Sequence, residues 1–349
     1  MSHTSNTLLE CPTIQDKLND HFTTCDPTAI REPIPFLEFI VSRTNTRNIL
    51  QNQIAPGSGK IRNVDLVYEP RLNENEVSTT SIQSCTSGAE GGQRHENYNL
   101  NVDVGSSYPM KFKLTSIAEI CEADELYIAR QLQKGMDVMI RKIATTTMEQ
   151  VPALKGNFGP NVATVNGSNE LVVATKKASG DIDTNFIEQI SFAAMDTQYC
   201  GVPYIFGYDE IHKAFKRVKA GCCATDGLNV GDFARNEGMV FMTDKRVLEV
   251  FGANHFISVG AGALQLLTYN EFMGPRGIRV IDTEIYKQTV ISDPATGIKF
   301  DLTWNFDCGV IYVQLKLAHK LVGMPHDMFF VDDPLENVTF VNEYLITNP

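Results

Sequence analysis

The clearest pattern of hydrophobic and polar positions predicts one very long helix over residues 116–150. Apolar side chains recur there close to the 3.6-residue spacing of a helix, and charged side chains fill the other faces. Ser116 and Glu119 fit a capping box, Gly135 marks an expected bend, and Pro152 ends the pattern. The apolar positions are Ile117, Ile120, Cys121, Ile128, Leu132, Met136, Met139, Ile140 and Ile143.

Two strand patterns flank a long polar segment that precedes this helix. Residues 61–67 form an apolar run, and residues 98–104 alternate between apolar and polar side chains. Between them, residues 71–97 are rich in Glu, Ser, Thr, Asn and Gly. Loops this long are uncommon in compact domains, and a long hairpin is not stable alone in water. We therefore expect a projecting hairpin that lies on a neighbouring copy of the chain. A floppy surface insertion is the alternative.

After residue 156 the pattern changes to short strands that alternate with helices. Strands are predicted at residues 171–174, 203–206 and 239–242, and a polar loop at residues 221–238. The residues expected to begin the helices are aspartates that suit a helix N-terminus: Asp183, Asp209 and Asp244. The alternation predicts an α/β unit whose sheet is covered by helices.

The two ends of the chain differ in their pattern of prolines and apolar residues. Residues 1–45 contain several prolines and read as an extended arm with one or two short helices, including the apolar run 36–41. A disordered tail is the alternative. Residues 277–286 and 299–316 read as long strands, with a tight turn at residues 293–297. The expected fold class is α+β, a mixed α/β arrangement.

Composition narrows the possible functions. The chain has 349 residues, 30 basic against 42 acidic side chains, and a formal net charge of -12. A protein that grips nucleic acid through many phosphates needs a local excess of Lys and Arg, and no dense basic run is present. Its 8 cysteines form no CxxC pair, which is typical of reduced thiols in a cytosolic protein. We expect no signal peptide and no membrane segment.

None of the candidate motifs for nucleotide or metal binding matches its full pattern. Gly57–Lys60 resembles a phosphate loop, but Ile54 and Ile61 stand where that motif needs Gly and Ser or Thr. Gly260 and Gly262 follow a strand-like run and more simply predict a turn. The histidines show no metal-ligand spacing. We expect no catalytic, cofactor-binding or metal-binding residue. A Cys–His pair formed only in space leaves a cytosolic α/β enzyme as an alternative.

The order of these elements resembles the major capsid protein family of tailed bacteriophages, whose fold is shared with encapsulin shell proteins. The segments that carry the resemblance are the hairpin Lys60–Val104, the helix Ser116–Gln150, the strands Pro203–Phe206 and Met239–Met242, and the strand pair near Ile278–Thr283 and Gly309–Leu315. The parts that it implies are an N-terminal arm (1–45), an extended hairpin loop (46–105), a peripheral domain with the spine helix (106–155 and 276–349) and an axial domain (156–275).

The resemblance implies a structural protein rather than an enzyme. Copies of the chain would form an icosahedral shell of pentamers and hexamers around a phage double-stranded DNA genome, without sequence-specific binding. It also implies portal and scaffolding or decoration proteins as partners, synthesis in the host cytoplasm, and a place in the virion capsid. An encapsulin-type nanocompartment shell is the alternative with the same fold. The subunit-interface candidates are Lys60, Arg62, Arg71, Glu74, Glu76, Gly91, Gly92, Arg94, Asp226, Asn229 and Asp232.

Overall fold

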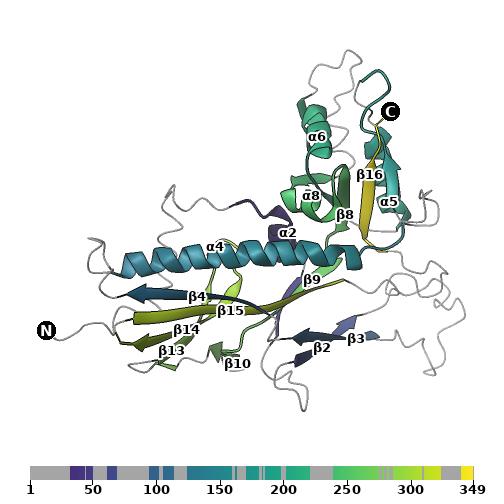
Figure 1. Ribbon diagram of the computed structural model, residues 1–349. Helices are drawn as coiled ribbons and strands as arrows, with labels where there is room; N and C mark the ends of the chain where they lie inside the picture. Colours follow the sequence, from purple (N-terminus) through teal and green to yellow (C-terminus); the bar gives the residue numbers. More distant parts are fainter. Residues whose placement is uncertain are drawn as a thin grey trace, which may run out of the picture.

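The computed structural model combines helices with several sheets (Figure 1). It describes residues 32–43, 45–49, 61–68, 94–101, 105–113, 124–158, 162, 170–180, 183, 185–197, 202–220, 239–274, 277–278, 281–282, 286–308, 310–323 and 339–348. The helices are α2 (Pro35–Arg43), α4 (Asp124–Gln150), α5 (Asn185–Asp196), α6 (Glu210–Ala220) and α8 (Lys245–Phe251), with the 3-10 helix η4 (Val151–Ala153). The predicted mixed α+β class is confirmed.

The larger sheet has seven strands, and a single long strand holds it together. The strands are β1 (Asn45–Ile49), β4 (Ser106–Lys113), β9 (Leu264–Tyr269), β12 (Ile281–Asp282), β13 (Tyr286–Ser292), β14 (Lys299–Asp307) and β15 (Val310–Gly323). The first half of β15 pairs with β14 and β4, and its second half, from Ala318 to Gly323, pairs with β9. A short antiparallel pair, β10 (Met273–Gly274) with β11 (Gly277–Ile278), lies apart from it.

The smaller sheet has five strands and is covered on both faces. Its order is β5 (Glu170–Val173), β16 (Val341–Ile346), β8 (His255–Gly260), β6 (Pro203–Gly207) and β7 (Val240–Thr243). Phe256 points into a core with α5 and α6, whereas its neighbour Ile257 points into the core that contains α2 and α8. This alternation is that of a strand buried on both faces, as predicted for a covered sheet.

Helix α4 runs along the larger sheet (Figure 1). It is a helix of 27 residues that begins at Asp124; the predicted residues 116–123 lie outside the described residues. Its buried face includes Leu132, Met136 and Ile140, packed in one core with β14 and β15. Gly135 lies against Met110 of β4, where an added Cβ would approach the Met110 sulfur to 3.0 Å. The glycine therefore allows close packing of helix and strand in a helix that runs on without interruption.

Helix α2 belongs to the core of the molecule. The Phe36 ring packs edge-on against Phe206 of β6 and the Phe39 ring packs tilted against it, with ring centroids 5.1 and 5.2 Å apart. Asp244, predicted to cap α8, accepts hydrogen bonds from the backbone N–H of Arg246 at 3.0 Å and of Phe36 at 3.2 Å. The predicted short helix is confirmed. The same carboxylate that caps α8 also ties the N-terminal segment down.

The strand predictions near the C-terminus need correction. Residues 299–316 are two antiparallel strands, β14 and β15, and the chain reverses near Cys308, whose φ is 46°. In the range 277–286, where one long strand was expected, the structure has the two short strands β11 and β12, and β13 begins at Tyr286. The predicted turn is confirmed, since Gly297 N–H donates to the Asp293 carbonyl at 2.8 Å. The reversal contains Gly309, a turn signal that the interpretation of residues 299–316 as one strand missed.

Each sheet also contains a strand from the far side of a predicted boundary. Strand β9, from the range expected to be axial, lies in the larger sheet, and β16, from the range expected to be peripheral, lies in the smaller sheet. The chain passes from β8 to β9 through a tight turn at Gly262, where φ is 85°. This is the turn predicted from the two glycines. The division into axial and peripheral domains stays a prediction.

Candidate assembly site

The base of the predicted hairpin is an antiparallel ladder of β2 (Ile61–Tyr68) and β3 (Arg94–Asn101). The pairing runs from Ile61 opposite Asn101 to Tyr68 opposite Arg94, which confirms that the two strand patterns form one hairpin. Residues 69–93 lie outside the described residues.

One face of this hairpin base packs on the chain's own body. Val64, Leu66 and Leu100 are buried, and Asp65 between the first two is exposed. Their partners in the same cluster are on β9 and β15: Leu267, Tyr269, Ala318 and Val322. We expected a neighbouring copy to support the whole hairpin, and this is wrong for its base. The alternating pattern showed that one face is buried, but not which surface buries it.

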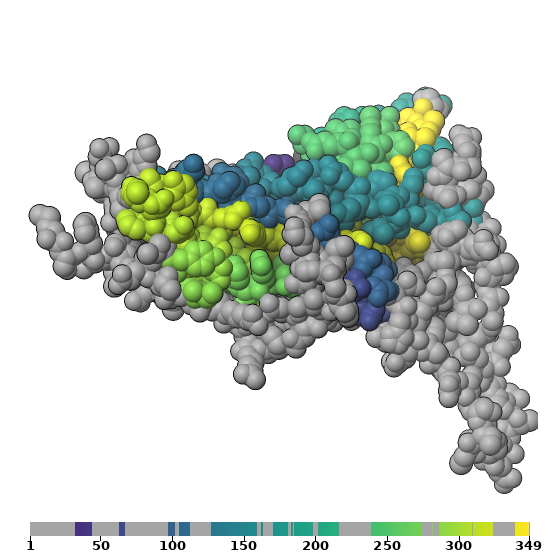
Figure 2. Space-filling model, turned by 60° about the horizontal axis from the view of Figure 1, so that its bottom comes forward, coloured from purple at the N-terminus to yellow at the C-terminus, as the bar shows by residue number. Residues whose placement is uncertain are grey.

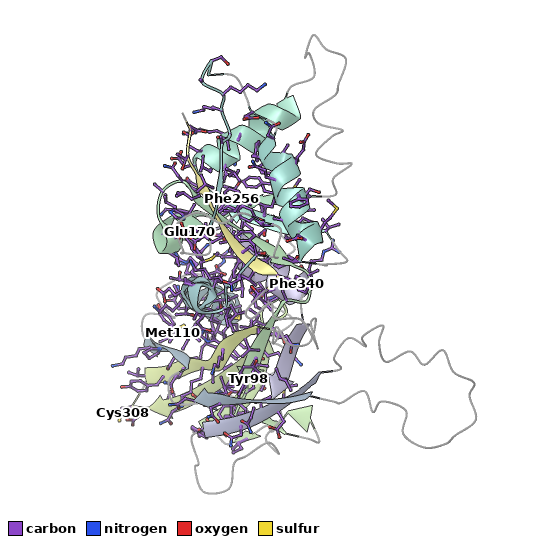
Figure 3. The ribbon with its side chains drawn as sticks, turned by 90° about the vertical axis from the view of Figure 1, so that its right-hand side faces the viewer. Tyr98, Met110, Glu170, Phe256, Cys308 and Phe340 are labelled. Atoms are coloured by element: carbon purple, nitrogen blue, oxygen red, sulfur yellow. The ribbon has the colours of Figure 1, made fainter. Side chains whose placement is uncertain are left out.

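Tyr98 and Lys320 fix the hairpin base in position. The Tyr98 hydroxyl donates to the Gly323 carbonyl at 3.2 Å, and the Lys320 ammonium donates to the Asn99 carbonyl at 3.2 Å. That ammonium also lies 6.0 Å from the centre of the Tyr98 ring. In Figure 2 the purple and blue residues of β2 and β3 form a patch on the surface. Figure 3 labels Tyr98 beside the lower strands. These contacts hold the β2–β3 ladder against β15 at residues 98 and 99.

Most of the predicted interface residues lie outside the described residues. Arg62 and Arg94 are in β2 and β3, near opposite ends of the ladder, where they pair with Leu100 and Tyr68. The ladder therefore does not bring these two residues together. The candidates outside the described residues are Lys60, Arg71, Glu74, Glu76, Gly91, Gly92, Asp226, Asn229 and Asp232.

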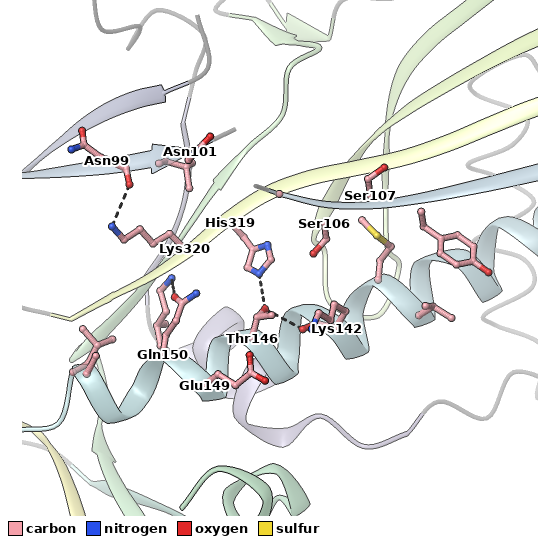
Figure 4. Close-up of a pocket in the computed structure, with 18 residues that line it drawn as sticks. Asn99, Asn101, Ser106, Ser107, Lys142, Thr146, Glu149, Gln150, His319 and Lys320 are labelled. Carbon is pink, nitrogen blue, oxygen red and sulfur yellow. Dashed lines mark hydrogen bonds between the residues drawn. The ribbon is translucent and has the colours of Figure 1, made fainter. Parts of the chain in front are cut away.

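A groove of about 860 Å³ opens beside the hairpin base, between β3, β4, α4 and β15 (Figure 4). Its walls mix apolar and charged side chains, and Val138 of α4 is 37% exposed there. The polar side chains in it include Asn99, Asn101, Lys142, Glu149 and Lys320. Sequence reasoning missed this groove, because its walls come from four segments far apart in the chain.

The groove contains one pair of side chains that resembles a nucleophile and a base. Thr146 Oγ1 and His319 Nε2 are 2.8 Å apart. Burial, with a smaller contribution from the nearby Lys142 ammonium, lowers the pKa of His319 to about 4. An imidazole with so low a pKa is a poor general base at neutral pH. Thr146 also lies within hydrogen-bonding distance of the Lys142 and Ile143 carbonyls. The pair therefore fits a structural link between α4 and β15 better than a catalytic site.

One set of side chains in the described parts of the chain lies close enough together that it could hold a metal ion. Glu170, His255 and Glu343 each offer a ligand atom, and these atoms lie within 4.8 Å of one another. We expected no metal site, because no motif has metal-ligand spacing. The three residues come from three strands, so no local spacing signals them.

Among the described residues, no helix is long and apolar enough to cross a membrane.

Comparison with solved structures identifies the fold. Over 94% of this chain and 99% of the other, the structure superposes on the cyanophage A-1(L) capsid asymmetric unit with a TM-score of 0.54 and 12% sequence identity. This chain has the fold of a tailed-phage capsid protein. The capsid of cyanophage P-SCSP1u covers 95% of this chain and 94% of its own, at 12% identity and a TM-score of 0.46. No family model matches the sequence, and no curated protein matches it.

The capsid fold confirms the resemblance drawn from the order of the elements. At 12% identity the likeness concerns the path of the chain. It carries over no individual residue of the cyanophage protein. The sequence pattern predicted a hairpin, then a long helix, then a helix-covered sheet. The structure has this order.

Proposed function

We propose that this chain is a structural major capsid protein. Copies of it assemble into an icosahedral shell of pentamers and hexamers that encloses a phage double-stranded DNA genome. The protein is made in the host cytoplasm and resides in the virion capsid. Its partners are further copies of itself, with portal and scaffolding or decoration proteins. The observation that carries this proposal is the capsid fold, matched over 94% of the chain.

The physical features of the chain support a shell subunit. Each contact in a shell can be of standard size, about 1,600 Å² or less, because every subunit makes several and the closed assembly gains from their number. A net charge of -12 suits a container that encloses DNA without binding its sequence. The low pKa of His319 favours a structural role for the groove rather than an enzymatic one.

Two segments are the proposed contacts between copies. The hairpin residues beyond the ladder, including Arg71, Glu74 and Glu76, drape over an adjacent subunit. The loop 221–238, including Asp226 and Asn229, meets its copies around the symmetry axes. The anchored base of β2 and β3 supports the first assignment, since a projecting segment transmits force to the body only if its root is fixed.

Deleting residues 73–92 is expected to abolish shell assembly and leave the subunit folded. The ladder ends at Tyr68 and Arg94, so the deletion removes none of its pairs. Residues 69–72 and 93 remain to close the hairpin, a usual loop length. Negative-stain microscopy measures particle yield, and circular dichroism with thermal unfolding measures folding.

The matched control replaces residues 73–92 with a Gly/Ser segment of the same length. If the side chains of the native segment make the contacts, both variants lose assembly. If only its reach matters, the replacement assembles and the deletion does not. A particle yield equal to that of the unaltered chain in both variants contradicts the hairpin assignment. Shells of the unaltered chain that contain a protein cargo instead of DNA favour a nanocompartment.

A further inference from the structure

Three adjacent strands of the smaller sheet bring Glu170, Glu343 and His255 onto one face. In the order β5-β16-β8, Glu170 of β5 lies directly opposite Glu343 of β16 in the parallel register. His255 of β8 pairs with Leu345, two residues beyond Glu343, so it lies diagonally next to Glu343. The three ligand atoms lie within 4.8 Å of one another. Figure 3 labels Glu170 between the end-on helix α4 and the top of the molecule.

The central carboxylate of this cluster is buried and held at both oxygens. Glu343 is 4% exposed. Its Oε1 lies 2.7 Å from His255 Nδ1, and its Oε2 forms an ion pair with the Lys155 ammonium. Because an ionised carboxylate only accepts hydrogen bonds, His255 Nδ1 is the donor. Both oxygens of Glu343 are thus fixed in direction.

The cluster places two carboxylates side by side. Like charges directly opposite each other on neighbouring strands destabilise a sheet. Here one of the two carboxylates is also buried, which raises the cost. Lys155 compensates Glu343, but the Glu170 carboxylate has no hydrogen bond or ion pair to any residue that the structure describes. Lys155, the lysine paired with this cluster in the described residues, contacts Glu343 and not Glu170.

We propose that Glu170, His255 and Glu343 bind one Zn²⁺ ion. The ion lies between His255 Nδ1 and Glu343 Oε1, where it replaces the proton that they share, and takes its third ligand from Glu170. One imidazole nitrogen with two carboxylate oxygens is a Zn²⁺ donor set, and solvent completes the tetrahedron. Ca²⁺ and Mg²⁺ need six or more mainly oxygen ligands. Lys155 then acts as the hydrogen-bond donor that orients a ligating carboxylate.

This site goes beyond the proposed capsid function, because it concerns the stability of the subunit whether or not shells form. The ion joins β5, β8 and β16, three strands whose ligands lie at residues 170, 255 and 343 of the chain. The ligand Glu343 also forms an ion pair with Lys155, which links the site to the segment that follows α4 and η4. Zn²⁺ binding therefore fastens the C-terminal strand to the rest of the sheet.

Metal binding tests the proposal directly. After treatment with EDTA and dialysis, the full chain is titrated with ZnCl₂ by calorimetry. We expect one tight Zn²⁺ per chain, and no comparable signal with CaCl₂ or MgCl₂. Glu170→Gln and His255→Gln should each weaken binding by at least about tenfold, since losing a residue that only orients a ligand already costs 10- to 100-fold. Glu188→Gln and His212→Gln, in the helices that cover the same sheet, are the matched controls and should bind as the unaltered chain does.

Thermal unfolding gives a second readout that an ordinary salt-bridge cluster does not produce. In EDTA, Glu170→Gln should unfold at the same temperature as the unaltered chain or a higher one, because it removes a like-charge pair. In Zn²⁺ the order should reverse, because only the unaltered chain gains from the full ligand set. Binding that is equally tight in Glu170→Gln and His255→Gln overturns the proposal. So does the lack of any tight Zn²⁺, which would mean that Lys155, His255 and the two glutamates form an ordinary polar network. If His255→Gln does not fold, Glu170→Gln decides.

Discussion

Replacing Met136 with aspartate is expected to leave no soluble, folded chain. Met136 is 0% exposed and lies on the buried face of α4, in the core shared with β14 and β15. Removing a buried side chain of this size costs about 2–5 kcal/mol, and burying an unpaired carboxylate adds several more. The sum reaches the total stability of about 5–15 kcal/mol that a folded domain has. Leu132→Asp, at 1% exposed, should behave in the same way. Soluble yield and circular dichroism measure the outcome.

Val138→Asp is the matched control for this experiment. Val138 lies on the same helix and is 37% exposed, so an aspartate there remains in contact with water. It should express and unfold cooperatively like the unaltered chain. Normal expression of Met136→Asp would show that this face of α4 is not a core, and the packing described for the larger sheet would then be wrong.

The elements with a strong local pattern were the ones that the sequence could predict. Helix α4 has apolar side chains at helical spacing along its whole length, so its packed face was evident before any tertiary contact was known. Strand β2 lies in a predicted apolar run and β3 in a segment that alternates between apolar and polar residues. The long polar segment between the two predicted that they pair. Strand β1 has the sequence NTRNI, in which one residue is strongly apolar. It is formed by parallel pairing with β9, which no local pattern shows.

The candidate site was less predictable than the fold, for a related reason. The groove beside the hairpin base and the Glu170–His255–Glu343 cluster both join residues that are distant in the chain. Strand β16 has the burial pattern of a central strand, and its place between β5 and β8 puts Glu343 beside two other strands. A glutamate in a short apolar run at the end of a sequence carries no such signal. The sequence predicted that β2 and β3 pair, whereas the surface that supports this hairpin base is evident only from the larger sheet.

The variants Asp301→Asn and His319→Gln are expected to give stability profiles of opposite slope between about pH 4 and pH 7. Burial raises the pKa of Asp301 from 3.8 to about 7, against the lowering effect of the Glu271 and Phe272 backbone N–H groups. Burial lowers the pKa of His319 from 6.5 to about 4. Because one pKa unit corresponds to about 1.4 kcal/mol, each shift is equivalent to about 3–4 kcal/mol.

The two signs follow from which state binds the proton. Folded Asp301 keeps a proton that the unfolded chain releases above pH 3.8, so its contribution to stability is lost as the pH rises towards 7. In the unfolded chain His319 binds a proton below pH 6.5, whereas in the folded chain it stays unprotonated down to about pH 4. Stability is therefore lost as the pH falls towards 4. In the unaltered chain these two effects largely cancel. Asp301→Asn leaves the His319 effect, and its stability relative to the unaltered chain should rise with pH.

His319→Gln leaves the Asp301 effect, so its stability relative to the unaltered chain should fall as the pH rises from 4 to 7. Urea unfolding of the three proteins at several pH values measures these differences, and subtracting the unaltered chain removes the carboxylates that titrate alike in all of them. The double variant should show neither slope, because Asp301 and His319 lie on different strands, β14 and β15, without a shared hydrogen bond. If the stability profiles of the two single variants were parallel, Asp301 and His319 would not be buried in the larger sheet as the structure has them.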